Sequence, residues 1–329
     1  MTLCPLLLTK PLTVGGQAVL EGVMMRGPFS WSVVVRLRDG TLQSKITPHL
    51  PWGKRYKILG FPLIRGAVIL LESLIIGYQA LNFSAAYAEL EDPQKKSTTP
   101  KKAPSQESLD PLALIFTLLC SVVLAIFLFL ALPHYLSLGL LERFKLAENS
   151  FPFHVVDGVL KFLIFLLYVW AIGLIPEIKR VFSYHGAEHR AIYTYEASLP
   201  FEAQKAKTFP LWHPRCGTAF IFVLLFLSII FFAIFFPLFF HYEGDSLVRR
   251  TLLSVGLKTL LMFPLAGISY EITRLAGAPN SSFIWKTLIF PGLLLQRLTT
   301  RETDDSQLEV ALHALKLVLE APDNTPQRL

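Results

Sequence analysis

Long apolar segments separated by polar stretches dominate the pattern along this chain. Four of these segments reach about 20 residues, the length that a helix needs to cross a hydrocarbon core of roughly 30 Å. They are residues 112–132, 155–176, 217–240 and 251–270. The pattern predicts a mainly α-helical, polytopic membrane protein with about four transmembrane helices, surrounded by a lipid bilayer.

Two further apolar segments are predicted to lie at the membrane interface. Residues 63–81 form an apolar helix with one polar stripe, typical of an interfacial or bundle-packed helix; the stripe carries Arg65, Glu72, Gln79 and Asn82. Residues 283–295 are too short to span, contain Lys286 and are broken by Pro291. We expect this second segment to be interfacial or re-entrant.

Basic residues are concentrated in alternate loops between the four predicted spans. Residues 95–111 carry four, residues 177–216 carry six and residues 271–329 carry six, whereas each intervening loop carries two. Because Lys and Arg accumulate in cytoplasmic loops, both termini and the 177–216 loop are predicted to be cytoplasmic. A fifth span at 63–81 would move eight more basic residues to the opposite side, so we retain four spans.

The remaining sequence predicts a small cytoplasmic α+β portion. Residues 35–46, with Asp39-Gly40 at their centre, predict a β-hairpin, since Asp-Gly suits the positive φ of a tight turn. Ser306 and Glu309 predict a capping box that opens a C-terminal helix. One face of this helix is apolar and is expected to dock on protein or membrane: Leu308, Leu312, Leu315 and Leu319.

These features divide the chain into four predicted regions. Residues 1–90 form an N-terminal cytoplasmic or interfacial region, and residues 91–111, rich in Pro, Lys and Ser, form a flexible linker. Residues 112–295 form the membrane bundle with its cytoplasmic 177–216 loop. Residues 296–329 form a cytoplasmic tail that contains the C-terminal helix.

The composition agrees with a membrane protein rather than a soluble one. Of the 329 residues, 53% are hydrophobic and 17% are charged, whereas soluble proteins carry about 25% charged residues. The basic loops account for the formal net charge of +7, so nucleic acid is not the expected partner. The three cysteines are widely separated and odd in number, which argues against a disulfide framework and for a reducing compartment.

The 177–216 loop concentrates residue types that bind transition metals. On a helix, His185, Glu188 and His189 share one face in H-x-x-E-H order, so two imidazoles can bind one ion while the carboxylate orients water. His213 and Cys216 are spaced to present an imidazole and a thiolate to the same ion. Because this ligand set favours zinc over magnesium or calcium, the predicted cofactor is a divalent metal with Zn²⁺ as first choice.

Glu196, further along the same helix face, is a candidate ligand or a hydrogen-bond acceptor for an imidazole. The simpler alternative for the histidines is hydrogen bonding to headgroups or backbone at the interface. If metal binds, three protein ligands and water predict a hydrolase-type site with Glu188 as general base. Four ligands including Cys216 predict a closed structural site instead, and the sequence leaves both open.

A glycine-rich run at residues 15–28 carries Gln17, Glu21 and Arg26 among apolar neighbours. These side chains are candidate supporting or substrate-binding groups on a tight loop pressed against another element. The favoured alternative is a packed turn with an ion pair between Glu21 and Arg26.

Residues 299–305 are rich in hydroxyl and carboxylate groups and include Thr300 and Arg301. They suit a polar ligand, but a loop that opens the C-terminal helix is the favoured interpretation. Arg215, inside the His-x-x-Cys turn, is a further candidate for a supporting or substrate-binding role.

Six motifs in this sequence resemble one bacterial family. They are GGQAVLEGVMMRGP at 15–28, PLIRGAVILLESL at 62–74, KRVFSYHGAEHRAI at 179–192, HPRCGTAF at 213–220, AGISYEI at 266–272 and LTTRETDD at 298–305. In this order they resemble the YqhQ-like family, which is described as predicted metal-dependent membrane proteins. The resemblance implies a protein of the bacterial inner membrane in which the GGQ, HGAEH, HPRCG and TTRETDD stretches form one functional unit.

Three functions are compatible with this sequence. The leading hypothesis is a metal-dependent hydrolase acting at the membrane–cytoplasm interface. The second is a non-enzymatic scaffold or assembly factor with a structural metal site and a cytoplasmic protein partner that contacts the 306–319 helix. The weakest is a transporter that uses Asp157, Lys258 and Glu271, because pairing within the bundle is the simpler expectation for intramembrane charges.

Overall fold

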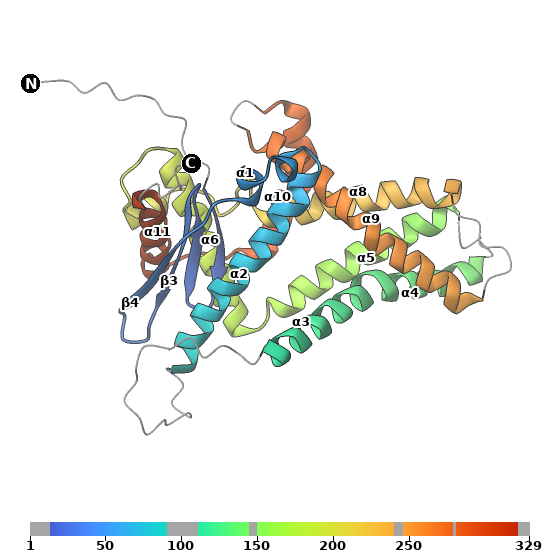
Figure 1. Cartoon of the computed structure of the whole chain (residues 1–329), viewed down its shortest axis with the longest axis horizontal. Helices are drawn as coiled ribbons and strands as arrows, with labels where there is room; N and C mark the ends of the chain where they lie inside the picture. The colour runs from blue at the N-terminus through green and yellow to red at the C-terminus, as the bar shows by residue number, and fades with distance from the viewer. Residues whose placement is uncertain (1–13, 91–110, 145–149, 240–245, 279–280, 322–329) are drawn as a thin grey trace, which may run out of the picture.

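The structure, a computed structural model, describes residues 14–90, 111–144, 150–239, 246–278 and 281–321. In Figure 1 a small unit of strands and helices lies at one end, and a bundle of long helices extends away from it. The predicted fold class, mainly helical with membrane-length helices and a small α+β part, is confirmed. The predicted linker lies outside the described residues except for Pro111, the first residue of α3.

Four strands form one antiparallel sheet in sequence order: β1 Gly15–Val19, β2 Gly22–Arg26, β3 Ser30–Arg36 and β4 Leu42–Pro48. The predicted hairpin is confirmed as β3 and β4, and Gly40 in its turn has a φ of +86°. The glycine-rich run forms a second hairpin, β1 and β2, which the sequence pattern does not predict. The reason is that β2 is buried on both faces, so it lacks the alternation that marks a half-exposed strand.

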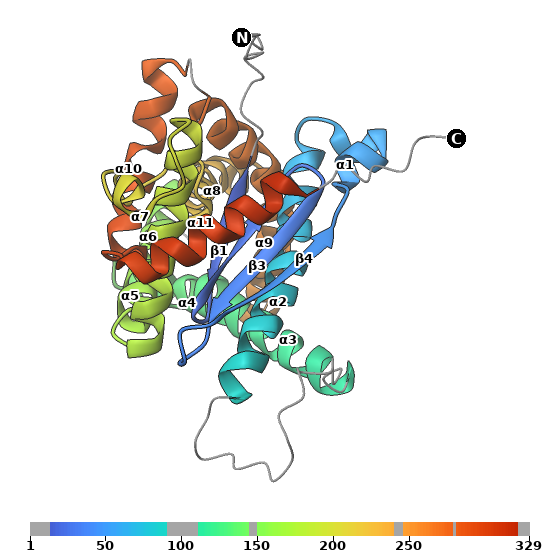
Figure 2. The same ribbon diagram turned by 90° about the vertical axis from the view of Figure 1, so that its left-hand side faces the viewer.

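Helices α6 (Pro176–Glu196) and α11 (Asp305–Glu320) cover one face of the sheet. Figure 2 shows α11 running diagonally across the strands. Leu308 and Leu315 of α11 are fully buried against Val34 of β3 and its neighbours. The apolar face of α11 is therefore buried within this chain, which corrects the expectation that it docks on the membrane or on a partner protein.

The capping box of α11 lies two residues earlier than the sequence predicts. Asp304, not Ser306, is the N-cap and accepts a hydrogen bond from the Gln307 amide, while the Gln307 side chain accepts one from the Asp304 amide. Ser306 lies in the first turn and donates to Asp304, and Glu309 pairs with Arg36. Both Asp304 and Ser306 are good N-cap residues, so residue type alone does not separate them.

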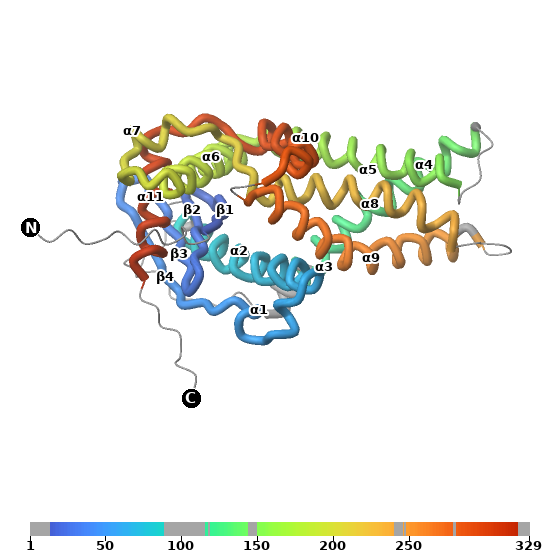
Figure 3. Tube along the Cα trace, turned by 90° about the horizontal axis from the view of Figure 1, so that it is seen from above, coloured from blue at the N-terminus to red at the C-terminus, as the bar shows by residue number. Residues whose placement is uncertain are grey.

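Helix α2 (Ile64–Leu90) covers the other face of the sheet. Seen from above in Figure 3, it lies between the strands and the bundle. Ile76 packs against Trp31 of the sheet. On the bundle side, a Cβ at Gly66 would lie 2.9 Å from the Gly267 Cα, so α2 and α9 are in close backbone contact. This placement agrees with the predicted interfacial or bundle-packed helix at 63–81.

The bundle consists of α3 Pro111–Ile126, α4 Leu132–Phe144, α5 Phe151–Ile172, α8 Gly217–Phe239, α9 Leu247–Ala276 and α10 Phe283–Thr299. The π-helical segment Phe127–Ala131 joins α3 to α4. Short turns elsewhere are α1 Trp52–Arg55, Lys57–Gly60 and α7 Ala203–Ala206. Among the described residues, five helices are long and apolar enough to cross a membrane; four correspond to the predicted spans, and the fifth is α2.

Helix α10 continues through Pro291, where the sequence predicts a break. A proline inside a helix removes one backbone hydrogen bond and strains the preceding turn. Packing against α8 supports the helix at this point, because a Cβ at Gly292 would lie only 3.0 Å from the Ala219 Cα. The favourable helix–helix contact therefore outweighs the local preference of proline.

Charged residues inside the bundle pair with one another. Lys258 of α9 donates to Asp157 of α5 over 2.6 Å, and the Lys161 Nζ lies 3.9 Å from the same carboxylate. Glu271 instead forms two hydrogen bonds with Arg65 of α2. The charges considered for a transport path thus belong to two separate ion pairs.

Candidate metal centre

Helix α6 places the H-x-x-E-H residues on one face, as their spacing predicts. Glu188 and His189 are buried, and His185 is 16% exposed. The helix begins with Pro176 at its first turn and packs against β1, β2 and α11. The three side chains therefore project from a rigid helix held by the core of the small unit.

Two histidines of α6 and one cysteine from the start of α8 come together. The His185 Nε2 lies 3.2 Å from the Cys216 Sγ, and the ligand atoms of His185, His189 and Cys216 all lie within 4.8 Å of one another. The Glu188 Oε2 lies 3.9 Å from the His185 Nε2 and 3.8 Å from the His189 Nε2. The carboxylate thus faces the same small volume as the three ligand atoms.

Backbone carbonyls fix the protonation of both α6 imidazoles. The His185 Nδ1 lies 2.8 Å from the Thr299 carbonyl oxygen, and the His189 Nδ1 contacts the Leu211 carbonyl oxygen. Because a carbonyl can only accept, each Nδ1 carries the proton and each Nε2 presents a lone pair to the cluster. Among the residues that the structure describes, the buried Nε2 of His189 has no hydrogen-bond partner. Neutral imidazoles oriented in this way suit a transition-metal ion.

Cys216 directly precedes α8, and its sulfur contacts the amide and the hydroxyl of Thr218. The Thr218 amide lies 3.4 Å from the Cys216 Sγ, and the Thr218 hydroxyl lies 3.2 Å from it. The partial positive charge of a helix N-terminus adds to these contacts. Cysteine binds metal through its sulfur as a thiolate, which makes Cys216 the candidate anionic ligand of the cluster.

His213 lies next to this cluster, with its Nε2 close to the Glu196 carboxylate. Its ring centroid is 5.8 Å from that of His189. The His213 Nδ1 accepts a hydrogen bond from the Arg215 amide, so the Nε2 carries the proton, and it lies 3.5 Å from the Glu196 carboxylate. Burial lowers the pKa of His213 to about 4. The structure thus groups Glu196, Arg215 and His213 beside the three ligand atoms rather than among them.

The glycine-rich hairpin supports the cluster through its backbone. A Cβ at Gly16 would lie 2.6 Å from the Glu188 Cγ, so β1 packs directly on that side chain. Burial raises the pKa of Glu188, while nearby His185 and His213 and a hydrogen bond from the Gly16 amide act in the opposite direction. The pKa of buried His189 is lowered chiefly by desolvation.

The three polar side chains of the same hairpin have separate partners. Gln17 packs against Gly77 of α2, where a Cβ would lie 2.3 Å from the Gln17 Oε1. Glu21, at the turn with a φ of +51°, accepts two hydrogen bonds from Arg180. Arg26 donates to the buried carboxylate of Glu72 over 2.6 Å. The expected ion pair between Glu21 and Arg26 is therefore wrong, because each residue has a nearer partner on a helix.

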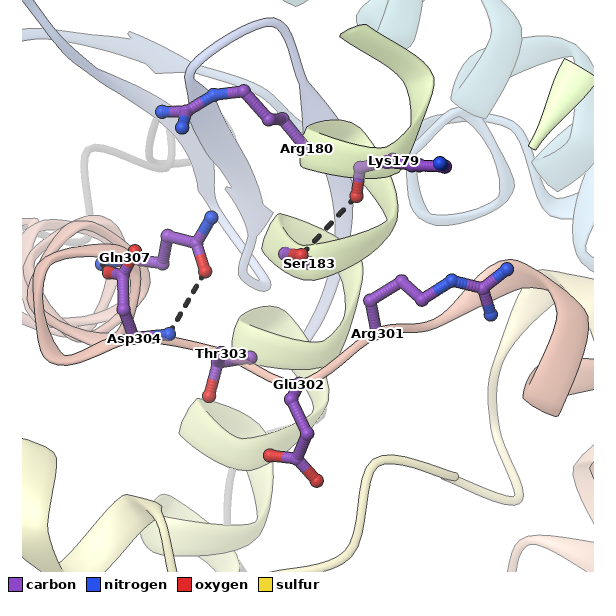
Figure 4. Close-up of a pocket in the computed structure, with 8 residues that line it drawn as sticks. All are labelled: Lys179, Arg180, Ser183, Arg301, Glu302, Thr303, Asp304 and Gln307. Atoms are coloured by element: carbon purple, nitrogen blue, oxygen red, sulfur yellow. Dashed lines mark hydrogen bonds between the residues drawn. The ribbon is translucent and has the colours of Figure 1, made fainter. Parts of the chain in front are cut away.

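The 299–305 segment forms the loop that opens α11, which was its favoured interpretation. Thr300 donates to the Gln296 carbonyl, and Arg301 donates to the carbonyls of Arg297 and Thr300. A surface hollow of about 470 Å³ lies beside this loop. Figure 4 shows that the side chains of Arg180 and Arg301, which line it, extend in different directions. These charged groups do not converge on one ligand.

Several supporting residues carry no clear signal in the sequence. Gly186 allows the loop to cross α6, since a Cβ there would lie 2.6 Å from the Arg301 carbonyl oxygen. Buried Arg190 donates to the Phe209 carbonyl and to Thr303, and so fixes both flanking loops to α6. The only hint is that Gly186 and Arg190 lie inside the same motif as the histidines.

Together, these features define a class: a helical protein suited to a lipid bilayer, with a small α/β unit at one end and a His/Cys cluster where the two meet. The chain belongs to the family described as "Protein of unknown function (DUF1385)", whose model matches residues 61–321. It is 30% identical over 310 residues to "Uncharacterized protein YqhQ" of Bacillus subtilis (strain 168), covering 94% of this chain and 93% of that protein. The resemblance to the YqhQ-like family is thereby confirmed. No solved structure matches the chain.

Proposed function

We propose that this protein is a multi-pass protein of the bacterial inner membrane that holds one Zn²⁺ with His185, His189 and Cys216 and acts as a metal-dependent hydrolase. The carrying observation is that three ligand atoms lie within 4.8 Å of one another with the Glu188 carboxylate against them. Three protein ligands are typical of catalytic zinc sites, which keep one position open. When bound, the ion supplies Lewis acidity to a water molecule or to a substrate oxygen.

The residues of this chain have distinct parts in the proposed reaction. The backbone carbonyls at Thr299 and Leu211 hold the two imidazoles in the tautomer that leaves each Nε2 free. Glu188 accepts the proton of the attacking water as general base, and its burial excludes bulk water from the carboxylate. The raised pKa of Glu188 brings this group nearer to the pH at which a general base works best.

The proposed site lies at the cytoplasmic face of the membrane. Support comes from the basic residues of the 177–216 and 271–329 segments, which flank the cluster in sequence. A reporter that is active only in the cytoplasm, fused after residue 329, is expected to be active. A reporter inserted between residues 145 and 149 is expected to be inactive, and the reverse pattern would overturn the orientation.

Cobalt substitution tests whether the site has an open position. We expect the Co²⁺-loaded protein to show a thiolate-to-metal absorption band that disappears in Cys216→Ser. Azide or cyanide added to the Co²⁺ protein is expected to change the visible absorption, because a small anion enters the open position. The Glu188→Gln variant is the control, since it should keep the metal spectrum. A spectrum that does not respond to small anions would contradict the hydrolase.

A structural metal site in a non-enzymatic scaffold is the second candidate. The observation that favours it is that the cluster connects α6 of the small unit to the start of α8 in the bundle. A metal there would fix the two parts to each other. In that case the Co²⁺ spectrum is insensitive to anions, and Glu188→Gln supports growth as well as the wild type does under conditions that require the protein.

A further inference from the structure

A cavity of about 590 Å³ lies directly beside the metal cluster. It is enclosed by the end of α6, the turn that contains His213, the end of α9 and one side of α10. His213 lines the cavity, and its ring stacks edge-on with Tyr193 at 4.6 Å and lies 5.8 Å from the His189 ring. A molecule in this cavity would therefore be separated from the ligand cluster by a single side chain.

The polar end of the cavity carries an excess of positive charge. Arg215 and Lys286 line it, and Glu196, the acidic group among its lining residues, pairs with Arg215. Lys286 has no carboxylate partner among the described residues. Gly277 makes room for Arg215, because a Cβ at this glycine would lie 2.5 Å from the Arg215 Cγ. The arrangement leaves one ammonium group, that of Lys286, without a compensating carboxylate among the described residues at the cavity.

Another part of the cavity lining is apolar and continuous with the exposed surface of α10. Ile289, Phe290 and Leu293 line it. Phe290 is 55% exposed, and on the same helix Phe283 and Ile284 are 82% and 73% exposed. In a protein with membrane-length helices, exposed apolar residues of this kind face lipid. An acyl chain can therefore run from the bilayer into the cavity along Phe290.

A tryptophan and an arginine mark the level of the headgroups at the cavity edge. Trp212 lines the cavity and is 40% exposed, and the Arg297 guanidinium lies 5.3 Å from the centre of its ring. Trp and Arg are residues that anchor a protein where headgroups meet acyl chains. The cavity lining thus combines cationic and apolar groups beside this tryptophan–arginine contact.

We infer that this cavity binds one anionic phospholipid, with its phosphate on Lys286 and Arg215 and its acyl chains along α10. That this lipid is also the substrate of the metal centre rests on the proposed hydrolase. Binding of the lipid in the cavity does not depend on that proposal. Charge complementarity selects an anionic over a zwitterionic headgroup, and the apolar wall selects a lipid over free phosphate. Removing one cation that faces a phosphate weakens binding about fivefold.

Native mass spectrometry of the delipidated full chain in detergent tests the inference. Phosphatidylglycerol, phosphatidylcholine and glycerol 3-phosphate are titrated separately, and we expect one phosphatidylglycerol to bind more tightly than either other probe. Lys286→Ala is expected to weaken that binding about fivefold. Lys179→Ala is the matched control, because Lys179 is exposed outside the cavity, and it should leave binding unchanged.

Leu293→Trp narrows the apolar half and gives a second variant that does not depend on charge. This variant is expected to weaken the binding of phosphatidylglycerol while leaving the unfolding temperature near that of the wild type. Equal binding of the two lipids, tighter binding of glycerol 3-phosphate, or equal effects of Lys286→Ala and Lys179→Ala would each overturn the inference.

Failure of the metal proposal and failure of the lipid proposal give different results in this titration. The titration is repeated with His185→Ala/His189→Ala, whose side chains do not line the cavity. Selective phosphatidylglycerol binding by this variant and by a wild type that contains no metal supports the lipid site while refuting the hydrolase. Loss of selectivity in a wild type that does contain zinc refutes the lipid site alone.

Discussion

The intramembrane cluster of Asp157, Lys161 and Lys258 contains two positive charges and one negative charge, which predicts unequal effects of single substitutions. All three residues are at most 4% exposed. At an effective dielectric constant of about 20, Coulomb's law gives about 6 kcal/mol for the 2.6 Å Lys258–Asp157 pair and about 4 kcal/mol for the 3.9 Å Lys161–Asp157 pair. Asp157→Asn removes both attractions and leaves two like charges buried together.

These Coulomb energies exceed the expected cost of the substitutions, because the charges are already desolvated in the wild type and the protein relaxes around each change. We expect Asp157→Asn to lower the free energy of unfolding by about 3–5 kcal/mol, the cost of leaving a buried charge unpaired. Lys161→Met leaves the closer pair intact and makes the cluster neutral, so its cost should be below about 1 kcal/mol. Lys258→Met leaves the longer pair and should fall between these two.

Reversible unfolding in mixed detergent micelles, followed by circular dichroism, measures the three variants against the wild type. The charge count requires Asp157→Asn to be the most destabilising of the three. If Lys161→Met costs as much as Asp157→Asn, the cluster is not governed by charge balance and this reasoning is refuted.

Two further predictions concern the small unit. Gly16→Ala places a Cβ 2.6 Å from the Glu188 Cγ and 2.8 Å from a backbone oxygen, so it should lower the free energy of unfolding by about 1–3 kcal/mol. A Cβ at Gly15 would have nothing within 4 Å, so Gly15→Ala should change the free energy of unfolding by less than about 0.5 kcal/mol. Equal effects of the two substitutions would show that β1 does not press on Glu188. Asp304→Ala removes the N-cap of α11 and should cost about 1 kcal/mol, and Ser306→Ala should cost less. Thermal unfolding followed by far-ultraviolet circular dichroism gives the order, and the opposite order would contradict the assigned cap.

The elements that depend on local pattern were predictable from the sequence. Four membrane-length helices follow from apolar length, the β3–β4 hairpin follows from alternation around Asp-Gly, and the shared face of His185 and His189 follows from helical spacing. Each of these features is encoded within about 20 consecutive residues, so no tertiary information is needed.

The features that depend on distant partners were not predictable. The α11 face docks on the sheet, and the carbonyls of Thr299 and Leu211 orient the histidines. Every residue has a backbone carbonyl, so residue type cannot identify the carbonyls that take this role. His213 has the expected chemistry, but its Nδ1 accepts a hydrogen bond from the Arg215 amide and its Nε2 lies 3.5 Å from the Glu196 carboxylate. Its place outside the three-ligand group therefore depends on tertiary contacts that the sequence does not show. Glu21 and Arg26 lie close in the sequence, yet each pairs with a helix that the sequence does not place nearby.

The metal content of the purified protein tests the three-ligand centre most directly. Wild type, His185→Ala, His189→Ala, Cys216→Ser and His213→Ala are prepared without chelators and analysed by inductively coupled plasma mass spectrometry, with circular dichroism to verify folding. We predict one zinc ion per wild-type chain, loss of zinc in the first three variants and its retention in His213→Ala, since the His213 Nε2 faces Glu196. A folded wild type without stoichiometric metal, or loss of zinc in His213→Ala equal to that in Cys216→Ser, would contradict the account.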